Sequence, residues 1–461
     1  MSGASPSLNP PDSVRWVVRT LEDAGHETWA VGGAVRDALA GRVTDDWDLT
    51  TRARPREVQR LFRRTVPIGI DHGTVGVLDR EGGLHEVTTF RRDVETTGRH
   101  AVVAFADRVE EDLARRDFTI NAVAWHPLRD ELLDPWDGAG DLARRRLRTV
   151  GVPEERFAED YLRILRGLRF AGRFRLEVEP ATWRALCRAV PGMEVLSRER
   201  IREELEKSLA DREAAAAILS LQAASGALRF LHPEWRDRIG ERVPEGGDRW
   251  ARALRAVEWA GRGTSGEARI EDRLSVLLAQ AVHPGESDPF EAAVLASVAF
   301  LDRLRSSRAR ARRVAARAGG AAAPPALGAS GLELRRWLAR VGREEAPGAL
   351  RVLSATLAAR AVRALPGRDG GQGGAFGEAR RDIAHLLRAL RRELRSGVPL
   401  ATDELAVTGR DLIRQGHRPG PAFGTVLDTL LQEVLADPER NREDVLLLRA
   451  DELLRQREDG R

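Results

Sequence analysis

Short apolar runs separated by turn signals fill the first ninety or so residues, whereas apolar residues recur at helical spacing further along the chain. Residues 28–35 and 43–51 predict strand-compatible segments on either side of a short helix. Val75–Leu78 and Leu84–Phe90 predict two further strands, because residues 80–83 carry a glycine pair typical of a turn. The pattern therefore predicts a small mixed sheet with flanking helices.

From Glu155 onward the pattern becomes helical. Leucines at a spacing of three, with arginines between them, predict one helix: Leu162, Leu165 and Leu168. Residues 197–200 precede a second helical series, which consists of Ile201, Leu205 and Leu209. Residues 318–330 and 366–377 are rich in small residues, so we expect both to be flexible, and the second is the best linker candidate.

Composition favours a helix-rich globular protein of about three domains, since 461 residues carry 32% charged and 42% hydrophobic side chains. No apolar run approaches the ~20 residues that span a bilayer, so no membrane association is expected. Residues 1–12 lack the basic start and apolar stretch of a signal peptide. The single Cys187 excludes an intramolecular disulfide. These features predict a cytoplasmic protein.

Arginine supplies nearly all of the positive charge, because Lys207 is the only lysine. The net charge is only +4, so the distribution of arginines matters more than their number. Arginines crowd residues 303–317, with no acid after Asp302. This cluster favours contact with a nucleic-acid backbone, although a solvated helix face in an arginine-rich protein would look the same.

Two carboxylates near the N-terminus carry the first chemical signal. Asp46 and Asp48 are one residue apart in a strand-like stretch, so both would point to the same face, about 6.5 Å apart. Magnesium is typically held by one or two carboxylates together with substrate phosphates. Gly32 and Gly33 open a predicted helix whose N-terminus could cradle a phosphate, and Arg36 could grip it bidentately. The combination predicts phosphoryl or nucleotidyl transfer.

The order of motifs over residues 28–210 resembles the class II tRNA nucleotidyltransferase and bacterial poly(A) polymerase family, a branch of the DNA polymerase β-like superfamily. The matching segments are residues 31–37, 45–51, 72–75, 86–91, 115–122, 137–142 and 159–166. Residues 405–412 and 418–424 resemble the tail domain of bacterial CCA-adding enzymes. Residues 230–370 match no family that we can name from their sequence.

The resemblance implies roles for residues that would otherwise be ambiguous. Asp46 and Asp48 would bind the metal ions rather than form a cap or turn. Glu86 would be the third carboxylate, although it could be an ordinary acid on a strand surface. Arg116 would contact the nucleotide, and Asp117 and Asn121 could reach the ribose. Without the resemblance, residues 115–117 would pass for a surface charge cluster.

Asp160 and Arg163 would form a protein template for the incoming base. At a spacing of three on a helix they would be neighbours, about 5–6 Å apart. An acceptor beside a donor matches the edges of cytosine and adenine but not those of uracil and guanine. The alternative is an ordinary ion pair on a helix surface. Arg166 and Arg169 would also serve the nucleotide site, or else pack and support the domain junction, because Arg169 lies about half a turn from Asp160.

We therefore predict an α+β protein: a DNA polymerase β-like nucleotidyltransferase head (1–150), a nucleotide-reading neck (151–230), a helical body (231–370) and a helical tRNA-binding tail (371–461). The predicted reaction is template-independent, Mg²⁺-dependent addition of CCA to the acceptor arm of tRNA from CTP and ATP, with no role for DNA. Rival activities are A-only or CC-only addition, poly(A) synthesis, or RNA binding without catalysis. Residues 67–74 and the tail favour CCA addition over poly(A) synthesis.

Overall fold

The computed structural model describes residues 8–70, 73–97, 100–243, 247–283, 285–362 and 373–459. Two compact units divide the chain. Unit 1 comprises Met1–Ser208 and Ala217–Leu228, and unit 2 comprises Leu209–Ala216 and Arg229–Arg461. None of the helices in the described ranges is both long and apolar enough to cross a membrane.

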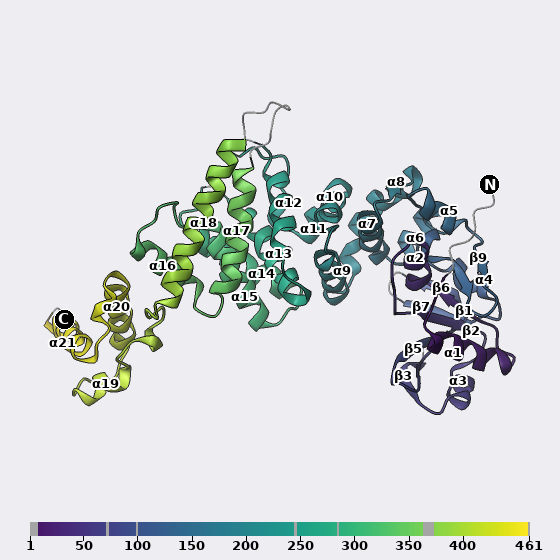
Figure 1. Cartoon of the computed structure of the whole chain (residues 1–461), viewed down its shortest axis with the longest axis horizontal. Coiled ribbons are helices and arrows are strands. Elements are labelled where there is room, and N and C mark those ends of the chain that lie inside the picture. Colours follow the sequence, from purple (N-terminus) through teal and green to yellow (C-terminus); the bar gives the residue numbers. More distant parts are fainter. Residues whose placement is uncertain are drawn as a thin grey trace. The chain divides into compact units, whose positions relative to one another are not determined.

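A seven-stranded mixed sheet organises unit 1 (Figure 1). Its order is β3-β4-β5-β2-β1-β8-β9. The strands are β1 (Thr28–Val31), β2 (Asp48–Thr51), β3 (Thr65–Gly69), β4 (Thr74–Leu78), β5 (Leu84–Thr89), β8 (Ala124–His126) and β9 (Glu131–Leu133). Among the described residues of this sheet, β2 and β5 pair in parallel, whereas the other neighbours pair antiparallel. Two small sheets pair β6 (Arg91–Thr97) with β7 (His100–Phe105) and β10 (Arg146–Leu147) with β11 (Glu177–Val178).

Helices surround this sheet and continue along the chain. They are α1 (Asp12–Asp23), α2 (Gly33–Leu39), α3 (Pro55–Leu61), α4 (Val109–Ala114), α5 (Gly138–Ala143), α6 (Pro153–Glu159), α7 (Leu162–Phe174) and α8 (Pro180–Ala189), with 3-10 turns at Thr119–Asn121 and Val190–Val195. Next come α9 (Arg198–Ala210), α10 (Ala215–Ser225) and α11 (Ala227–Leu231), which span the sequence boundaries between the two units. Alternation along the strands decides what is buried: Val75, Val77 and Val87 belong to one apolar cluster with residues of α1 and α3.

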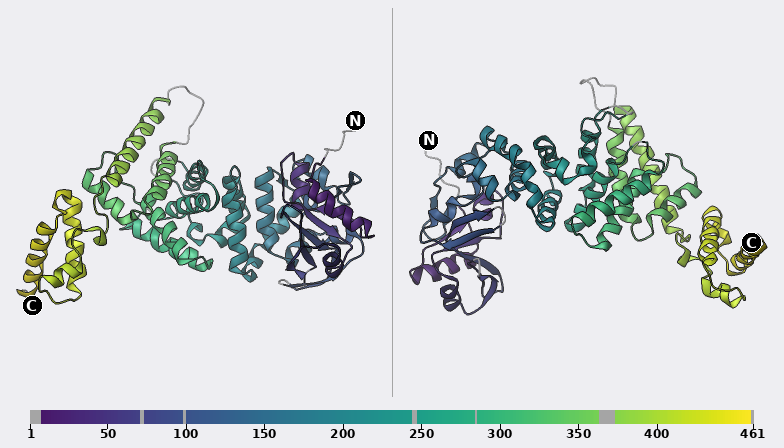
Figure 2. Two further views of the ribbon diagram at one scale, coloured as in Figure 1. Left: turned by 60° about the horizontal axis from the view of Figure 1, so that its bottom comes forward. Right: turned by 180° about the vertical axis from the view of Figure 1, so that it is seen from behind.

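Unit 2 is helical in its described part. Its helices are α12 (Arg249–Ala260), α13 (Gly266–Gln280), α14 (Pro289–Arg303), α15 (Arg308–Ala322), α16 (Gly331–Val341), α17 (Ala346–Ala361), α18 (Gly373–Arg395), α19 (Gly409–Arg414), α20 (Ala422–Ala436) and α21 (Glu443–Asp459), with 3-10 turns at Pro233–Trp235, Thr402–Glu404 and Pro438–Arg440. Figure 2 shows the sheet and these helices from two further directions. One apolar cluster runs from Phe290 on α14 to Leu454 on α21.

The predicted α+β class is confirmed, as are the strands on both sides of the turn at 80–83 and the helix that buries Leu162, Leu165 and Leu168. The predicted strand 43–51 was too long, because only Asp48–Thr51 is a strand, and Asp46 precedes it. Likewise β1 ends at Val31, before α2.

The flexibility expected for 318–330 was wrong for residues 318–322 and stays a prediction for the rest. Residues 318–322 form the last turn of α15, and Gly319 and Gly320 pack closely against Phe290 and Trp337. Most of the linker candidate 366–377 lies outside the described residues, as does His72 in the motif at 72–75. The four-part domain division stays a prediction. Leucines of α18, which begins the predicted tail, share one apolar core with residues of α16 and α17 in the predicted body.

Candidate active site

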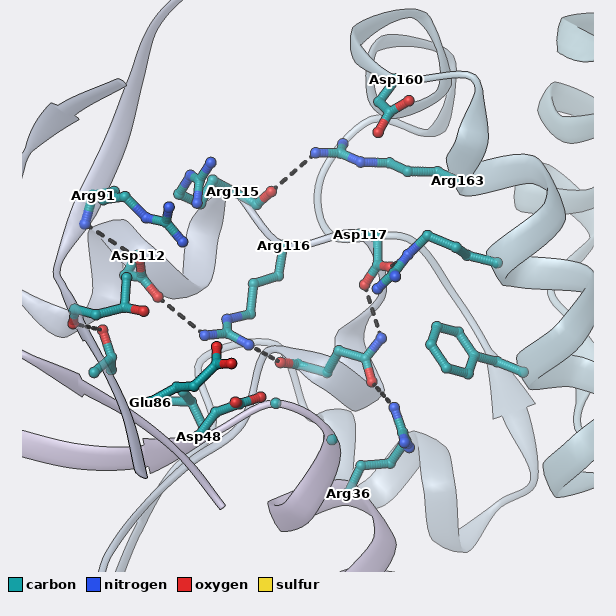
Figure 3. Close-up of a pocket in the computed structure, with 18 of the residues that line it drawn as sticks. Arg36, Asp48, Glu86, Arg91, Asp112, Arg115, Arg116, Asp117, Asp160 and Arg163 are labelled. Atoms are coloured by element: carbon teal, nitrogen blue, oxygen red, sulfur yellow. Dashed lines mark hydrogen bonds and ion pairs between the residues drawn. The ribbon is translucent and has the colours of Figure 1, made fainter. Parts of the chain in front are cut away.

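A cavity of about 630 Å³ lies within unit 1, at the open face of the sheet (Figure 3). Its walls come from the start of α2, from β2 and β5, from α4 and the segment after it, and from α7 and α9. Every predicted site residue except Asp46 lines this cavity: Gly32, Gly33, Arg36, Asp48, Glu86, Arg116, Asp117, Asn121, Asp160, Arg163, Arg166 and Arg169. The fold thus brings together residues that are more than 130 positions apart in the sequence.

Gly32 lets the backbone approach the charged groups at the cavity floor. Its φ of +73° lies in the left-handed region that side-chain-bearing residues rarely adopt. A Cβ at this position would lie 2.9 Å from Arg116 Nη1 and 3.6 Å from Asp48 Oδ2. The backbone conformation therefore favours glycine, and a larger residue would displace the Arg116 guanidinium; α2 begins at the next residue.

Asp48 and Glu86 face the cavity from neighbouring strands. In the parallel pairing of β2 with β5, Leu49 lies beside Val87, so the preceding residues, Asp48 and Glu86, point together to the open face. Burial, the negative charge of Asp46 and that of Glu86 raise the pKa of Asp48 to about 6, against the opposing effect of Arg116. Excess negative charge therefore collects at this point.

The carboxylates suit a hard divalent cation, because bound positive charge would relieve their repulsion. Within the described ranges, no group of three or more His, Cys, Asp or Glu side chains is placed to hold a metal by itself. An ion here would need water or substrate oxygens to complete its coordination, which is the arrangement that magnesium favours. Asp46 is exposed and precedes the strand, so the predicted shared face is not seen, and its metal role stays a prediction. Its negative charge nevertheless raises the pKa of Asp48.

A chain of hydrogen bonds connects α2 with α7 beneath the cavity. Arg36 Nη1 donates to Asn121 Oδ1 at 2.6 Å, and Asn121 Nδ2 donates to Asp117 Oδ1 at 2.8 Å. Arg166 Nε donates to Asp117 Oδ2 at 2.7 Å. Burial alone would raise the pKa of Asp117, but Arg166 and these hydrogen bonds outweigh it and lower the pKa to about 2. Asp117 therefore remains ionised and fixes the position of Arg166.

Arg36 is more enclosed than the sequence suggested. Its Nε and Nη2 donate to Asp37 Oδ1 at 2.8 and 2.6 Å, and its guanidinium lies 4.8 Å from the ring centres of Phe170 and Phe174. Arg36 is only 6% exposed. A phosphate contact would have to share nitrogens that already bond to protein.

Arg116 is positioned by α4. Its Nη2 donates to Asp112 Oδ2 at 3.2 Å, and its Nη1 donates to the carbonyl of Asn121 at 3.4 Å. Its Nε has no hydrogen-bond partner in the described part of the chain. An arginine held beside Asp48 with a buried donor to spare is suited to bind an anion.

The predicted helix placement of Asp160 was wrong. Asp160 is extended and lies between α6 and α7, where its Oδ1 accepts the backbone N–H of Leu162 at 3.0 Å. Its Oδ2 accepts from Arg200 Nη2 at 2.6 Å. Arg163 donates instead to Glu159 at 2.6 Å and to the carbonyl of Arg115 at 3.1 Å. Both side chains still line the cavity (Figure 3), and the backbone N–H of Arg163 donates to the carbonyl of Asp160 at 3.0 Å. The two residues therefore stay close, although Asp160 lies outside the helix that carries Arg163.

Arg166 and Arg169 both line the cavity, and each donates to a carboxylate, Asp117 and Glu204 respectively. Arg169 Nε donates to the buried Glu204 at 2.8 Å, so this arginine also joins α7 to α9. Five charged lining residues were not among the predicted site residues: Arg91, Asp112, Arg115, Arg200 and Lys207. Arg91 and Arg115 lie in segments that match the family, whereas Asp112 and Arg200 carried no sequence signal. Lys207 stood out as the one lysine in an arginine-rich chain. Its Nζ donates to Glu204 Oε1 at 3.2 Å.

Several of the arginines that the sequence singled out at 303–317 form ion pairs within unit 2. On α15, Arg313 pairs with Glu271 at 2.6 Å, and Arg317 pairs with Glu271 and Asp272 at 2.9 and 3.2 Å. On α15 and α18, the exposed arginines without an ion pair in the described ranges are Arg308 and Arg312, here called the α15 pair, together with Arg381, Arg388, Arg391, Arg392 and Arg395. Arg388 and Arg392 line a groove of about 770 Å³.

Comparisons with known proteins agree with this geometry. Residues 28–148 match the poly A polymerase head domain, and residues 175–238 match a domain described as the probable RNA- and SrmB-binding site of polymerase A. The CCA-adding enzyme of Streptococcus suis is 44% identical over 195 residues, which make up 42% of this chain and 48% of that protein. The chain thus spans about half the length of the curated relatives that it matches.

Two solved structures extend the similarity along the whole chain. The Bacillus stearothermophilus CCA-adding enzyme in complex with CTP superposes with a TM-score of 0.70 at 28% identity, over 98% of this chain and 99% of the other. The Thermotoga maritima CCA-adding enzyme complexed with tRNA-CCA shares the fold, with a TM-score of 0.58 at 21% identity over 98% and 97%. Residues 28–148 and 175–238 therefore match the models of the poly A polymerase head and RNA-binding domains, and the chain as a whole is similar to CCA-adding enzymes.

Proposed function

We propose that this protein adds CCA to the 3′ end of tRNA from CTP and ATP. The observation that carries the proposal is that Asp48 and Glu86 lie side by side on the open face of the sheet, where they line a cavity that also contains many arginines. Carboxylates on one side and cationic donors on the other suit a transferred nucleotide with a charged leaving group. The similarity to CCA-adding enzymes, one of them bound to CTP, supports the same reaction.

The head-domain family implies dependence on a divalent metal, and we propose Mg²⁺, held by Asp46 and Asp48 with Glu86 as the third carboxylate. When bound, such ions lower the pKa of the primer 3′-hydroxyl and neutralise charge on the α-phosphate and pyrophosphate. Arg116, next to Asp48, would bind the triphosphate, and the N-terminus of α2 would approach it through Gly32 and Gly33.

Base selection would depend on Asp160 and Arg163 even though they are not helix neighbours. Asp160 Oδ2 already accepts from Arg200, and a carboxylate oxygen can accept a second hydrogen bond. The amino group of cytosine or adenine could supply that bond, whereas a carbonyl of uracil or guanine would repel the carboxylate. Asp117 and Asn121 would contact the ribose only by rearranging bonds that they already make with each other and with Arg36.

The tRNA partner is supported by the RNA-binding domain match and by exposed arginines of α18. Unpaired guanidinium groups bind phosphates readily, because they release counterions without breaking an ion pair within the protein. A tRNA substrate also accords with the predicted cytoplasmic location. We propose no contact with DNA.

One assay tests the proposal and separates its rivals. A tRNA transcript that lacks CCA is incubated with the protein, magnesium and a single labelled nucleotide at a time. CCA addition predicts two C residues with CTP alone and a further A when ATP is added. A tract of A would indicate a poly(A) polymerase, whereas C without A, or A only on a CC end, would indicate a partial enzyme. No incorporation would leave only RNA binding.

A further inference from the structure

An exposed apolar patch lies on the same sheet face as the carboxylates. Ile68 on β3 is 42% exposed, and Leu84 on β5 is 50% exposed. Val66, also on β3, is 38% exposed. Most large aliphatic residues of unit 1 are buried, so three exposed ones gathered around one position of the sheet merit a functional explanation.

Gly76 brings this patch together. A Cβ at Gly76 would lie 2.7 Å from Ile68 Cδ1 and 2.8 Å from Leu84 Cδ1. The two side chains therefore meet over Gly76, in the space that any larger residue would fill. Gly76 is the direct cross-strand partner of Glu86, so the patch borders this carboxylate.

From β2 toward the edge strand β3, the side chains on the open face change from acidic to aliphatic. Asp48 lies on β2 and Glu86 on β5, and Gly76 on β4 and Ile68 on β3 follow. Arginines of α7 and of the segment after α4 line the cavity, whereas Ile68 and Leu84 do not line it. The carboxylates thus stand between a cationic side and an aliphatic side.

Resting on the proposed function, we propose that Ile68 and Leu84 form a ledge that holds the base of the primer's 3′-terminal nucleotide. The reaction requires the 3′-oxygen to reach the α-phosphate beside the carboxylates. Because the incoming nucleotide would occupy the arginine-lined side, the terminal nucleotide of the primer approaches from the other side of Glu86, where the ledge lies.

An aliphatic surface also suits the changing identity of this nucleotide. The terminal base differs between the unextended tRNA end and the intermediate ends in C, so a hydrogen-bonding pocket would favour one step over another. Ile68 and Leu84 side chains offer neither donor nor acceptor, and the faces of every base can pack against them. The ledge therefore holds the primer without selecting its sequence.

The test is a double-mutant cycle on the full-length protein. Wild type and I68Q/L84Q extend two tRNA primers that lack CCA, one with a normal terminal nucleotide and one whose terminal nucleotide is abasic. The matched control is L132Q, which changes a 38% exposed leucine at the opposite edge of the same sheet. The measured quantities are kcat/KM for each primer and KM for CTP.

We expect the abasic end to lower kcat/KM about tenfold in wild type and in L132Q, but at most twofold in I68Q/L84Q, with KM for CTP unchanged. An equal loss in I68Q/L84Q and wild type would overturn the ledge. If I68Q/L84Q does not fold, the wild-type comparison still decides, since full activity on the abasic end would also overturn it. Absence of any addition by wild type would instead refute the proposed function.

Discussion

Replacing Asp117 with asparagine tests whether the buried hydrogen-bond chain organises the nucleotide site. Asp117 is 7% exposed and accepts from Asn121, from Arg166 and from the backbone N–H of Phe118. The variant keeps one acceptor oxygen but turns an amide N–H₂ toward Arg166, so donor faces donor. We expect unit 1 to become less stable and Arg166 to move from its position, because its bond to Asp117 is lost.

The magnitude follows from the pKa of Asp117, which drops from 3.8 to about 2. Since one pKa unit corresponds to about 1.4 kcal/mol, ionisation of this carboxyl group stabilises the fold by about 2–3 kcal/mol. Because the folded pKa lies below the unfolded one, this stabilisation is complete above pH ~5 and is lost as the pH falls toward 2. D117N should therefore lose about 2–3 kcal/mol at pH 7 and show a weaker acid dependence.

Hydrogen–deuterium exchange of α7 peptides in the full chain measures the local free energy of opening. D141N is the matched control, because Asp141 is fully buried and bonds to Thr119 and Arg148 without lining the cavity. Both variants should destabilise the fold, but only D117N should raise KM for CTP. A loss below about 0.5 kcal/mol in D117N, or an equal rise of KM in D141N, would refute the reasoning.

Four further outcomes follow from the structure. D48A should abolish addition of both C and A while tRNA affinity persists, and substantial turnover in magnesium would remove Asp48 from the metal site. D160A should raise kcat/KM for UTP relative to CTP, so an unchanged ratio would place base selection elsewhere. R388A/R392A should weaken tRNA binding and its salt dependence more than alanine substitution of the α15 pair, as measured by Kd at several salt concentrations. Burial lowers the pKa of His232 from 6.5 to about 3, so wild type should lose stability as the pH falls from 6.5 to about 3. H232L should not show this loss, and an identical pH dependence of stability in both proteins would contradict the reasoning.

Local patterns predicted the elements well where burial follows sequence spacing. Leu162, Leu165 and Leu168 are buried because α7 packs with the period that the sequence shows. Asp160 escaped this reasoning because a short carboxylate can bond to a nearby backbone N–H, which here interrupts the helix between α6 and α7. Spacing alone does not reveal such a break, so the placement of Asp160 and Arg163 on one helix was mispredicted.

Long-range partners account for the other differences. The arginines of α15 looked free because Glu271 and Asp272 lie more than 40 residues earlier in the sequence. Gly319 and Gly320 looked flexible, yet they permit close packing against Phe290 and Trp337, aromatic residues from other helices. The order of the motifs predicted which residues line the cavity, whereas the hydrogen-bond partners of these residues could be identified only from the folded structure.

The most direct test of CCA addition is to sequence the products made when all four nucleotides compete. A tRNA transcript lacking CCA is incubated with the protein, magnesium and equal concentrations of ATP, CTP, GTP and UTP, with D48A as the inactive control. The account predicts that wild type leaves ends that terminate in CCA and that D48A leaves the transcript unextended. Ends with a tract of A, ends of mixed sequence, or unextended ends with wild type would contradict it.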